Sequence, residues 1–509
     1  MLARVRTFAI DGVDPRQVWV EVDIRPGLPA FTIVGLGDTA VRESRDRIRA
    51  AILNSGFDFP GRRITANLAP AFLRKAGPGF DAALALAILA ASGQLPNGGL
   101  DAYAVFGELS LGGELRDSAG ALAVAEGARQ AGCSRLIVPR QRGREAALVT
   151  GLEVVAVGDL RAAADVVCGA EPPPVPALAA APGAARRGTQ PDLADIRGHA
   201  APLLALQIAA AGGHNLLMEG PPGTGKTMLA RRLPSILPEL TRAEAIEVTR
   251  IHSVAGQSTE SLISARPFRA PHHTISASGL AGGGLPPRPG EATLAHLGVL
   301  FLDELSEFQR SSLDALRQPL EDGAVTIVRG QRALRLPTRF MLVAATNPCP
   351  CGYAGADDDR CGCGEAELRR HRRRLSGPLL DRMDLVIDVQ RPAGDALRAP
   401  PATSSARARE VVAAARERQR ARLAGTGAGA NGEMDVRAAQ QLVRLSTAAE
   451  HELGRAYASG LLSARGRHRV LRVAQTIADL DGHDRVSRVD VLTALSLRQR
   501  TVGEVVATI

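Results

Sequence analysis

The chain has 509 residues, 45% of them hydrophobic, with a formal net charge of +9 and a pI near 9.9. This length allows about three compact domains. The excess of basic residues favours a polyanionic partner. The 3% aromatic content argues against base stacking as the main mode of nucleic-acid contact. The start of the chain resembles no secretory signal and the longest apolar stretch, Ala82–Ala91, is too short to span a bilayer, so we expect a cytoplasmic protein without a membrane partner.

Residues 1–170 have the pattern of an α/β domain. Alternating apolar residues predict a strand at Val18–Ile24, and a helix at 41–54 and a further strand at Arg63–Leu68 follow. The segment 171–191 is rich in Pro, Ala and Gly and has no apolar period. This composition predicts an extended linker between the first domain and the rest of the chain.

Three segments of the first domain, Gly77–Asp81, Phe106–Leu109 and Ala131–Pro139, resemble the proteolytic domain of Lon-type proteases. Peptidase activity in that fold needs a serine nucleophile and a lysine base. The positions that match them fall at Gly79 and near Val124. The resemblance therefore implies a Lon-protease-like domain without its catalytic dyad. We expect no protease activity, and the domain serves either as a scaffold or as a DNA- or partner-binding element.

The segment 220–227 is a complete phosphate-binding loop, preceded by a predicted strand at Asn215–Met218 and followed by a predicted helix. Its glycines let backbone N–H groups converge on phosphates, and the helix N-terminus adds a favourable dipole. Lys226 would reach the β- and γ-phosphate oxygens, and the Thr227 hydroxyl would ligate Mg²⁺. We therefore predict that a nucleoside triphosphate binds to Gly220, Pro221, Pro222, Gly223, Thr224, Gly225, Lys226 and Thr227.

Two apolar runs downstream end in polar residues. The run Gly298–Leu302 is followed by Asp303 and Glu304, and the run Phe340–Thr346 is followed by Asn347. Buried parallel strands deliver such side chains to one edge of a sheet. We predict that Asp303 holds Mg²⁺ at the nucleotide, that Glu304 deprotonates the attacking water, and that Asn347 positions this water beside the γ-phosphate.

Two arginines are candidates to complete the predicted hydrolysis site. Hydrolysis through a loose transition state needs positive charge from outside the phosphate-binding loop. Arg382 lies between a short helical stretch and the predicted strand Leu385–Val389, and Arg465 lies at the start of a predicted helix. Spacing alone does not distinguish either of them from a solvated surface arginine.

With these motifs, the chain resembles the ComM/YifB-type magnesium-chelatase-like AAA+ ATPases over nearly its whole length. The segments Arg269–Thr274, Gly290–Ala292 and Ala344–Pro348 carry the resemblance outside the phosphate loop. It implies an α/β fold with three parts. These are the Lon-protease-like N-terminal domain, a P-loop AAA+ core with a parallel sheet at 192–395, and a helical lid at 396–509.

The resemblance also implies roles, cofactors and a partner. Arg382 looks like the trans-acting finger that completes a neighbouring subunit's site, and Arg465 looks like the lid-borne sensor, with Arg469 as the alternative. Glu304 and Asn347 complete the expected catalytic set. ATP and Mg²⁺ are the implied cofactors. A homo-hexamer is the implied active form, so that an isolated protomer would hydrolyse ATP slowly.

Two insertions in the core are the predicted places of substrate contact. The segment 251–284, the helix-2 insert, is rich in Pro, Gly and His, which favours a structured loop. Val325–Arg335 predicts a hairpin around a basic turn. We call it the pre-sensor hairpin, because it precedes the predicted strand Phe340–Thr346, which we call the sensor strand. In ring ATPases of this type such hairpins face the pore, so Arg329, Arg332 and Arg335 are candidates for contact with the DNA backbone. A solvated hairpin with ordinary surface arginines is the alternative.

Four of the six cysteines lie in two CxC pairs directly after the sensor strand. Four thiolates can hold a tetrahedral Zn²⁺, although CxxC is the commoner spacing in zinc fingers. We assign no metal to His272 and His273, which we expect to shape the helix-2 insert. The CxC pairs indicate either a structural zinc site or reduced, unligated thiols at Cys349, Cys351, Cys361 and Cys363.

These features are compatible with two classes of function. The first is a hexameric DNA helicase or branch-migration motor that acts on single-stranded, double-stranded or branched DNA in recombination or transformation. The alternative is a magnesium-chelatase-type ATPase subunit, although the chain has no integrin-like DxSxS motif and no acidic linker. An adaptor ATPase that remodels other proteins is a third interpretation.

Overall fold

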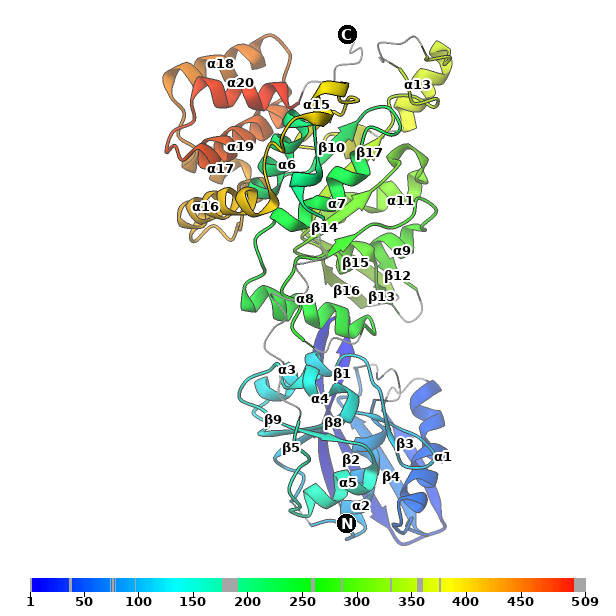
Figure 1. Ribbon diagram of the computed structural model, residues 1–509. Helices are drawn as coiled ribbons and strands as arrows, with labels where there is room; N and C mark the ends of the chain where they lie inside the picture. The colour runs from blue at the N-terminus through cyan, green and yellow to red at the C-terminus, as the bar shows by residue number, and fades with distance from the viewer. Residues whose placement is uncertain are drawn as a thin grey trace. The chain divides into compact units, whose positions relative to one another are not determined.

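The computed structural model describes residues 2–498, apart from 36–38, 74, 76, 78, 97, 176–190, 258–260, 285–286, 330–331, 355–359 and 375–376. The chain divides into two compact units (Figure 1). The first comprises Met1–Pro182, Thr241–Ser264 and Gly330–Leu334, and the second comprises Gly183–Leu240, Ala265–Arg329 and Arg335–Ile509. Most of the predicted linker falls at 176–190 and so lies outside the described residues.

A mixed sheet of seven strands, in the order β3-β4-β2-β1-β5-β8-β9, forms the centre of the first unit. Strands β1 and β2 are antiparallel, and Asp11 pairs with Asp14 across a two-residue turn. Such a short connection fixes their register, which places alternate residues on the same face of the sheet. The strands are β1 (Leu2–Asp11), β2 (Asp14–Arg25), β3 (Ala30–Val34), β4 (Arg63–Ala69), β5 (Tyr103–Val105), β8 (Arg135–Pro139) and β9 (Glu153–Val157), and β6 (Glu108–Leu109) pairs with β7 (Leu115–Arg116) outside the sheet.

Helices cover both faces of this sheet, and each face has its own hydrophobic cluster. Helix α2 has no polar side, because all of its 11 residues are buried. The longest apolar stretch of the sequence is therefore a core helix that packs against β1 and β2. The helices are α1 (Thr39–Asn54), α2 (Asp81–Ala91), α3 (Ala121–Gln130), α4 (Gly143–Ala146) and α5 (Leu160–Val167).

Helix α8 (Arg242–Val254) follows the phosphate-loop helix in sequence but belongs to the first unit. Its Arg250 forms an ion pair with Glu126 at 3.2 Å. Its Ser253 hydroxyl donates a hydrogen bond to the buried carboxylate of Glu145. The predicted helix-2 insert therefore begins within the last turn of a regular helix rather than in a loop.

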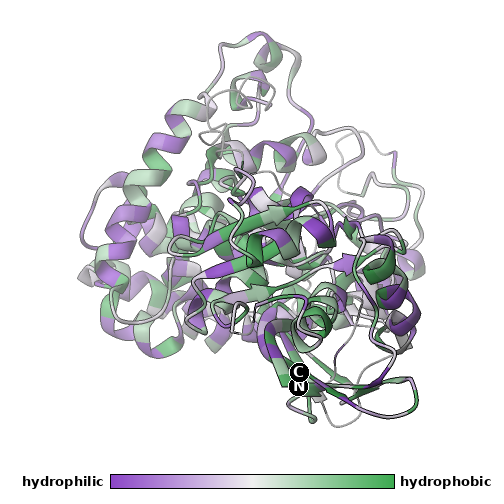
Figure 2. Ribbon diagram, turned by 90° about the horizontal axis from the view of Figure 1, so that it is seen from below, coloured by the Kyte–Doolittle hydropathy of each residue, from purple (hydrophilic) through white to green (hydrophobic). Residues whose placement is uncertain are grey.

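The second unit contains a five-stranded parallel sheet in the order β11-β14-β17-β10-β18. Leu216 and Met218 point into one hydrophobic cluster and Leu217 into another, so both faces of the sheet are covered. Figure 2 shows that strands of the chain are largely hydrophobic (green), whereas many helices carry both hydrophobic and hydrophilic residues. The strands are β10 (Leu216–Glu219), β11 (Phe268–Arg269), β14 (Val299–Leu302), β17 (Met341–Thr346) and β18 (Leu385–Asp388).

The helices of the second unit form two groups. Helices α6, α7 and α16–α20 share one hydrophobic cluster with the sheet, and α9–α11 and α14 pack on the opposite face. The C-terminal helices lie together beside α6 (Figure 1). The bounds are α6 (Ala200–Gly212), α7 (Lys226–Ile236), α9 (Ala277–Ala281), α10 (Glu291–Leu294), α11 (Arg310–Ala315), α12 (Arg317–Asp322), α13 (Glu365–Arg374), α14 (Gly377–Leu380), α15 (Gly394–Arg398), α16 (Ser405–Leu423), α17 (Val436–Leu442), α18 (Thr447–Ala458), α19 (Ala464–Asp481) and α20 (Arg488–Ser496).

Two small hairpins accompany the parallel sheet. The predicted pre-sensor hairpin consists of β15 (Ala324–Arg329) and β16 (Arg332–Pro337), and β12 (Gly282–Gly283) pairs with β13 (Arg288–Pro289). The parallel sheet and the C-terminal helices confirm the predicted α/β fold class. Among the residues that the structure describes, no helix is long and apolar enough to cross a membrane.

Candidate nucleotide-binding site

The phosphate loop connects strand β10 to helix α7. Gly223 and Gly225 have φ angles of +77° and +90°, which residues with a side chain rarely adopt, so the turn requires glycine at both positions. The Thr224 hydroxyl donates to the carbonyl oxygen of Pro221 at 2.9 Å and closes the loop. The loop thus has the backbone shape that lets N–H groups converge on phosphate oxygens.

The side chain of Lys226 spans this loop. Its ammonium group donates to the carbonyl oxygens of Gly220 and Pro221, at 2.5 and 2.8 Å, and to Asn347 Oδ1 at 3.1 Å. Burial lowers the pKa of Lys226, and the nearby Asp303 carboxylate counteracts this shift. This contact brings the loop lysine together with Asn347, the residue predicted to position the attacking water, although 121 residues separate them in sequence.

Thr227 and Asp303 supply two oxygens at the start of helix α7 and the end of strand β14. The Thr227 hydroxyl donates to Asp303 Oδ2 at 2.7 Å, and Asp303 Oδ1 accepts from the Glu304 N–H at 3.0 Å. Hydroxyl and carboxylate oxygens are ligands that Mg²⁺ prefers. The donor pair therefore fits a magnesium ion shared with a bound triphosphate.

Glu304 has an unusual backbone conformation, with φ at +52°. This left-handed geometry is rare for a residue with a side chain, and functional sites are enriched in it. The Glu304 carboxylate lies 3.5 Å from Nδ1 of His273. His273 is also in contact with the rings of His272 and Phe308. The sequence analysis missed this pairing, because His273 lies 31 residues earlier in the chain.

Arg382 and the phosphate loop of the same chain lie at opposite ends of two neighbouring strands. Strands β10 and β18 are parallel, with Leu216 opposite Leu385 and Glu219 opposite Asp388. Arg382 precedes β18, whereas the phosphate loop follows β10. Because a strand rises by about 3.3 Å per residue, the start of β18 and the end of β10 lie on the order of 13 Å apart along the strand direction. The structure therefore does not bring Arg382 together with Lys226.

The Arg382 guanidinium forms an ion pair with Glu321 of helix α12. Burial lowers the pKa of Arg382, and the positive charges of Arg317 and Arg465 lower it further. Arg465, exposed in the first turn of α19, is thus close enough to act on Arg382. Arg469 instead lies 3.6 Å from the Asp384 carboxylate, which favours Arg465 over Arg469 as the candidate sensor.

The four cysteine thiols of the CxC pairs lie together. Each offers a sulfur atom within 4.8 Å of the others, and the Sγ–Sγ separations among Cys349, Cys351 and Cys361 are 3.3, 3.7 and 3.8 Å. A tetrahedral Zn²⁺ with bonds of about 2.3 Å places its sulfur ligands roughly 3.8 Å apart. The arrangement of Cys349, Cys351, Cys361 and Cys363 therefore fits this metal.

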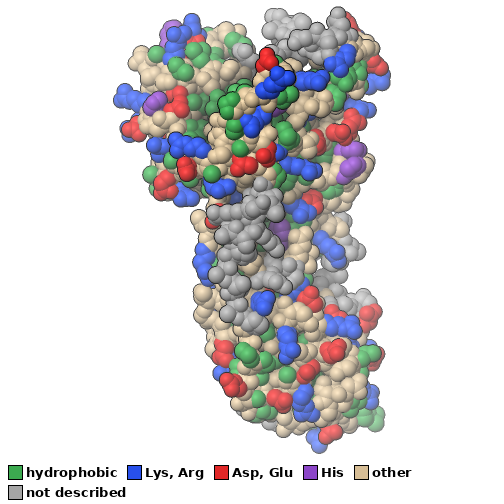
Figure 3. Space-filling model, viewed as in Figure 1, with side chains coloured by type: hydrophobic (Ala, Val, Ile, Leu, Met, Phe, Trp, Pro, Cys, Tyr) green, Lys and Arg blue, Asp and Glu red, His purple; other side chains and the backbone are tan. Residues whose placement is uncertain are grey.

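The predicted DNA-binding arginines are only partly described. Arg335 is exposed on β16, whereas the side chains of Arg329 and Arg332 and the turn at 330–331 lie outside the described residues. Where Figure 3 colours the side chains, basic ones lie among acidic ones.

Comparison with known proteins agrees with this geometry. The family "Magnesium chelatase, subunit ChlI" matches residues 192–397, "Subunit ChlI of Mg-chelatase" matches residues 20–142, and its C-terminal counterpart matches residues 402–498. The chain is 42% identical to uncharacterized protein YifB of Escherichia coli, 41% to YifB of Salmonella typhimurium and 41% to Competence protein ComM of Haemophilus influenzae. Each alignment covers 98% of this chain and 97% of the relative.

The chain belongs to the ComM/YifB-type magnesium-chelatase-like family. The expected resemblance is thereby confirmed. Members of this family have an AAA+-type ATPase core, and the family suggests ATP and Mg²⁺ as the cofactors here. The roles of individual site residues, including Glu304, Asn347 and Arg382, stay predictions.

Proposed function

We propose that this chain assembles into a homo-hexamer that couples ATP hydrolysis to DNA remodelling, as a helicase or branch-migration motor. The observation that carries the proposal is the placement of Arg382. Arg382 and the phosphate loop of its own chain lie at opposite ends of the parallel strands β18 and β10. A role of Arg382 in hydrolysis therefore requires the nucleotide site of a neighbouring protomer. A ring provides such a neighbour for every copy.

The chemistry follows from the positions of the side chains. Lys226 would bind the β- and γ-phosphate oxygens, and Thr227 and Asp303 would hold Mg²⁺, which would offset charge on the phosphates. Glu304 takes a proton from the attacking water. Asn347, 3.1 Å from the Lys226 ammonium, orients that water beside the γ-phosphate. Arg382 from the adjoining protomer stabilises the charge of the transition state.

DNA is the proposed substrate because of three features. The net charge of +9 favours a polyanion, the hairpin β15–β16 presents the exposed Arg335, and the relative from Haemophilus influenzae is named a competence protein. The low aromatic content indicates contact with the phosphate backbone rather than base stacking.

The test combines assembly, ATPase and DNA assays. We expect a hexamer in the presence of ATP and Mg²⁺, with an ATPase rate that rises when four-way DNA is added. Lys226→Ala should lose ATP turnover. Arg382→Ala should still bind ATP but hydrolyse it about 10³- to 10⁵-fold more slowly. Full activity of a demonstrably monomeric protein would contradict the shared site, and a rate indifferent to DNA would contradict the DNA substrate.

We also propose that the four clustered cysteines bind one structural Zn²⁺. Measurement of metal by mass spectrometry on protein purified without added zinc should find one zinc per chain. Cys361→Ser should lower the metal content and the thermal stability of the protein, whereas Cys133→Ser, a buried cysteine outside the cluster, should leave the metal in place. A metal-free wild-type protein with four reactive thiols would refute the zinc site.

A further inference from the structure

We propose that Asp384 is a positioning residue for the Arg382 finger. It ties the finger to helix α19 of the lid, so that Arg382 and Arg465 reach an adjoining protomer as one rigid piece. This inference rests on the proposed function, which assigns Arg382 to the neighbouring site. Asp384 lies two residues after Arg382, at the start of strand β18, and it is buried.

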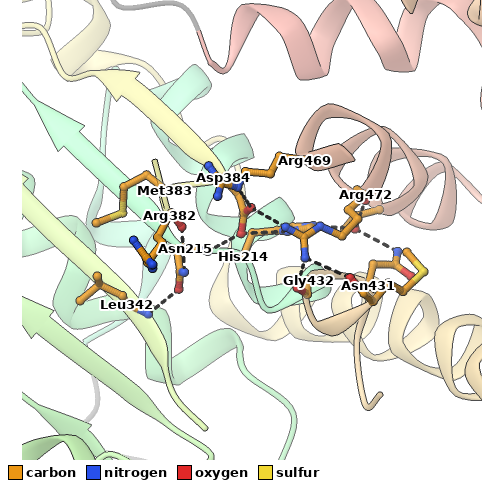
Figure 4. A network of polar contacts seen from close by, with 12 residues as sticks. His214, Asn215, Leu342, Arg382, Met383, Asp384, Asn431, Gly432, Arg469 and Arg472 are labelled. Atoms are coloured by element: carbon orange, nitrogen blue, oxygen red, sulfur yellow. Dashed lines mark hydrogen bonds and ion pairs between the residues drawn. The ribbon is translucent and has the colours of Figure 1, made fainter. Parts of the chain in front are cut away.

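The lid side of this link consists of two arginines of helix α19 (Figure 4). Asp384 Oδ1 lies 3.2 Å from Nη2 of Arg472 and 3.6 Å from Nε of Arg469. Arg472 also donates to the carbonyl oxygens of Gly432 and Met434, at 2.6 and 3.2 Å. Solvent screens buried charges only weakly, so these contacts hold α19 firmly against the carboxylate.

The core side of the link runs through Asn215, which precedes strand β10. Its N–H donates to Asp384 Oδ2 at 3.2 Å, and its side-chain amide donates to the Arg382 carbonyl oxygen at 3.0 Å. Its Oδ1 accepts from the N–H of Leu342 in strand β17 at 2.8 Å. Figure 4 shows Asn215 between these groups. The backbone of the finger is therefore fixed to two strands of the sheet.

A second buried contact joins the same parts. His214 is fully buried, with Nδ1 at 3.6 Å from Asp384 Oδ2 and Nε2 at 2.8 Å from the Thr476 hydroxyl of α19. Arg465 lies seven residues before Arg472 on that helix, which is about two helical turns. The contacts of Asp384 with α19, His214 and Asn215 thus help to set the spacing between Arg465 and Arg382.

The charges explain why an acid is required at this position. Burial raises the pKa of Asp384, but His214, Arg472 and Arg469 together outweigh burial and lower it to about 2. The carboxylate is therefore charged at neutral pH. Without it, the cations of Arg469 and Arg472 would lose the buried carboxylate that both of them contact. They would repel, and α19 would shift away from the finger.

The test is a mixing experiment with two inactive variants. Asp384→Asn retains an intact phosphate loop but a misplaced finger, whereas Lys226→Ala retains an intact finger but cannot use ATP. Each variant alone should have little ATPase activity. Asp384→Asn should have a reduced kcat but should bind a fluorescent ATP analogue with the affinity of the wild type. Mixed rings should regain activity, because Lys226→Ala protomers lend their fingers to the Asp384→Asn sites. Mixing that restores nothing would overturn the inference.

Three controls keep the outcome interpretable. Arg382→Ala mixed with Lys226→Ala must also regain activity, and if it does not, the shared site itself is wrong. Asp395→Asn, the same change at an exposed position of helix α15, should leave kcat near that of wild type. If Asp384→Asn does not assemble, Asn215→Ala replaces it, since it removes the hydrogen bond to Arg382 without leaving an unpaired buried charge. Asn215→Ala rings with the kcat of wild type would then refute the role assigned to the network.

Discussion

The contact between His273 and Glu304 bears on the proposed role of Glu304 as general base. A general base must present one carboxylate oxygen to water, and the Glu304 side chain is 60% exposed and so free to take other rotamers. His273 is held in a turn, because the Ile275 N–H donates to the His272 carbonyl oxygen and Ser312 of α11 donates to the carbonyl oxygen of Ile275. The imidazole can therefore orient the carboxylate.

We expect His273→Ala to lower kcat for ATP hydrolysis about tenfold with little change in KM. This is a part of the roughly 10²- to 10⁴-fold that a general base contributes. His273→Gln, which keeps an N–H donor, should recover most of the rate, and His272→Ala serves as the matched control. Steady-state kinetics decide the matter, and a higher kcat for His273→Ala would mean that the histidine restrains Glu304 instead of orienting it.

The lowered pKa of Asp384 also predicts how the free energy of unfolding depends on pH. Its folded pKa of about 2 is below the unfolded value of about 3.9. The stabilisation is therefore complete above about pH 4 and is lost as the pH falls from about 4 towards 2, with a total on the order of 2 kcal/mol. Urea unfolding of the wild type and Asp384→Asn across this range measures the difference. The stability gap between the two proteins should narrow with acidification, and a constant gap would be inconsistent with the assigned charge.

Among the structural elements, the sequence predicted best those whose residues are neighbours in the chain. The phosphate loop with its helix, the strands that carry Asp303 and Asn347, and the pre-sensor hairpin all lie where motifs and apolar runs placed them. Contiguous patterns report local geometry directly. Contacts such as His273 with Glu304 or Arg382 with Glu321 depend on which loops meet in space, and polar surface residues carry no periodic signal for that.

The contacts of helix α8 could not be predicted from the sequence. Its position in the sequence suggests a part of the nucleotide core, but its contacts are with α3 and α4 of the first unit. The decisive groups are a buried carboxylate, Glu145, and donors at Leu122, Arg142 and Ser253. Neither the charge nor the spacing of these residues identifies them as partners.

We predict that Ser253→Ala destabilises the first unit by about 1 to 3 kcal/mol, because Glu145 would lose one hydrogen-bond donor inside the protein. Differential scanning calorimetry or urea unfolding monitors the effect. Ser496→Ala is a suitable control, since that serine is exposed at the end of α20 and bonds only locally. Equal stability of Ser253→Ala and wild type would show that α8 is not anchored through Glu145.

For the whole molecule, the number of contacted phosphates would govern how the proposed binding to DNA responds to salt. Each phosphate neutralised by a cation contributes about −0.9 to the slope of log affinity against log salt concentration. Arg335→Ala should therefore weaken binding uniformly across DNA sequences and reduce the slope by about 1. Arg437→Ala, an exposed arginine on α17, should leave the slope unchanged if the hairpin is the contact. Fluorescence anisotropy at several salt concentrations gives both slopes.

The separation of Lys226 and Arg382 across the sheet also bears on what one defective copy does among normal ones. In the proposed ring, a copy that lacks Lys226 would silence its own pocket, and a copy that lacks Arg382 would silence the pocket next to it. A copy that carries both changes would silence two pockets. When a cell produces defective and normal chains together, the double change should therefore be the more dominant over the wild-type gene.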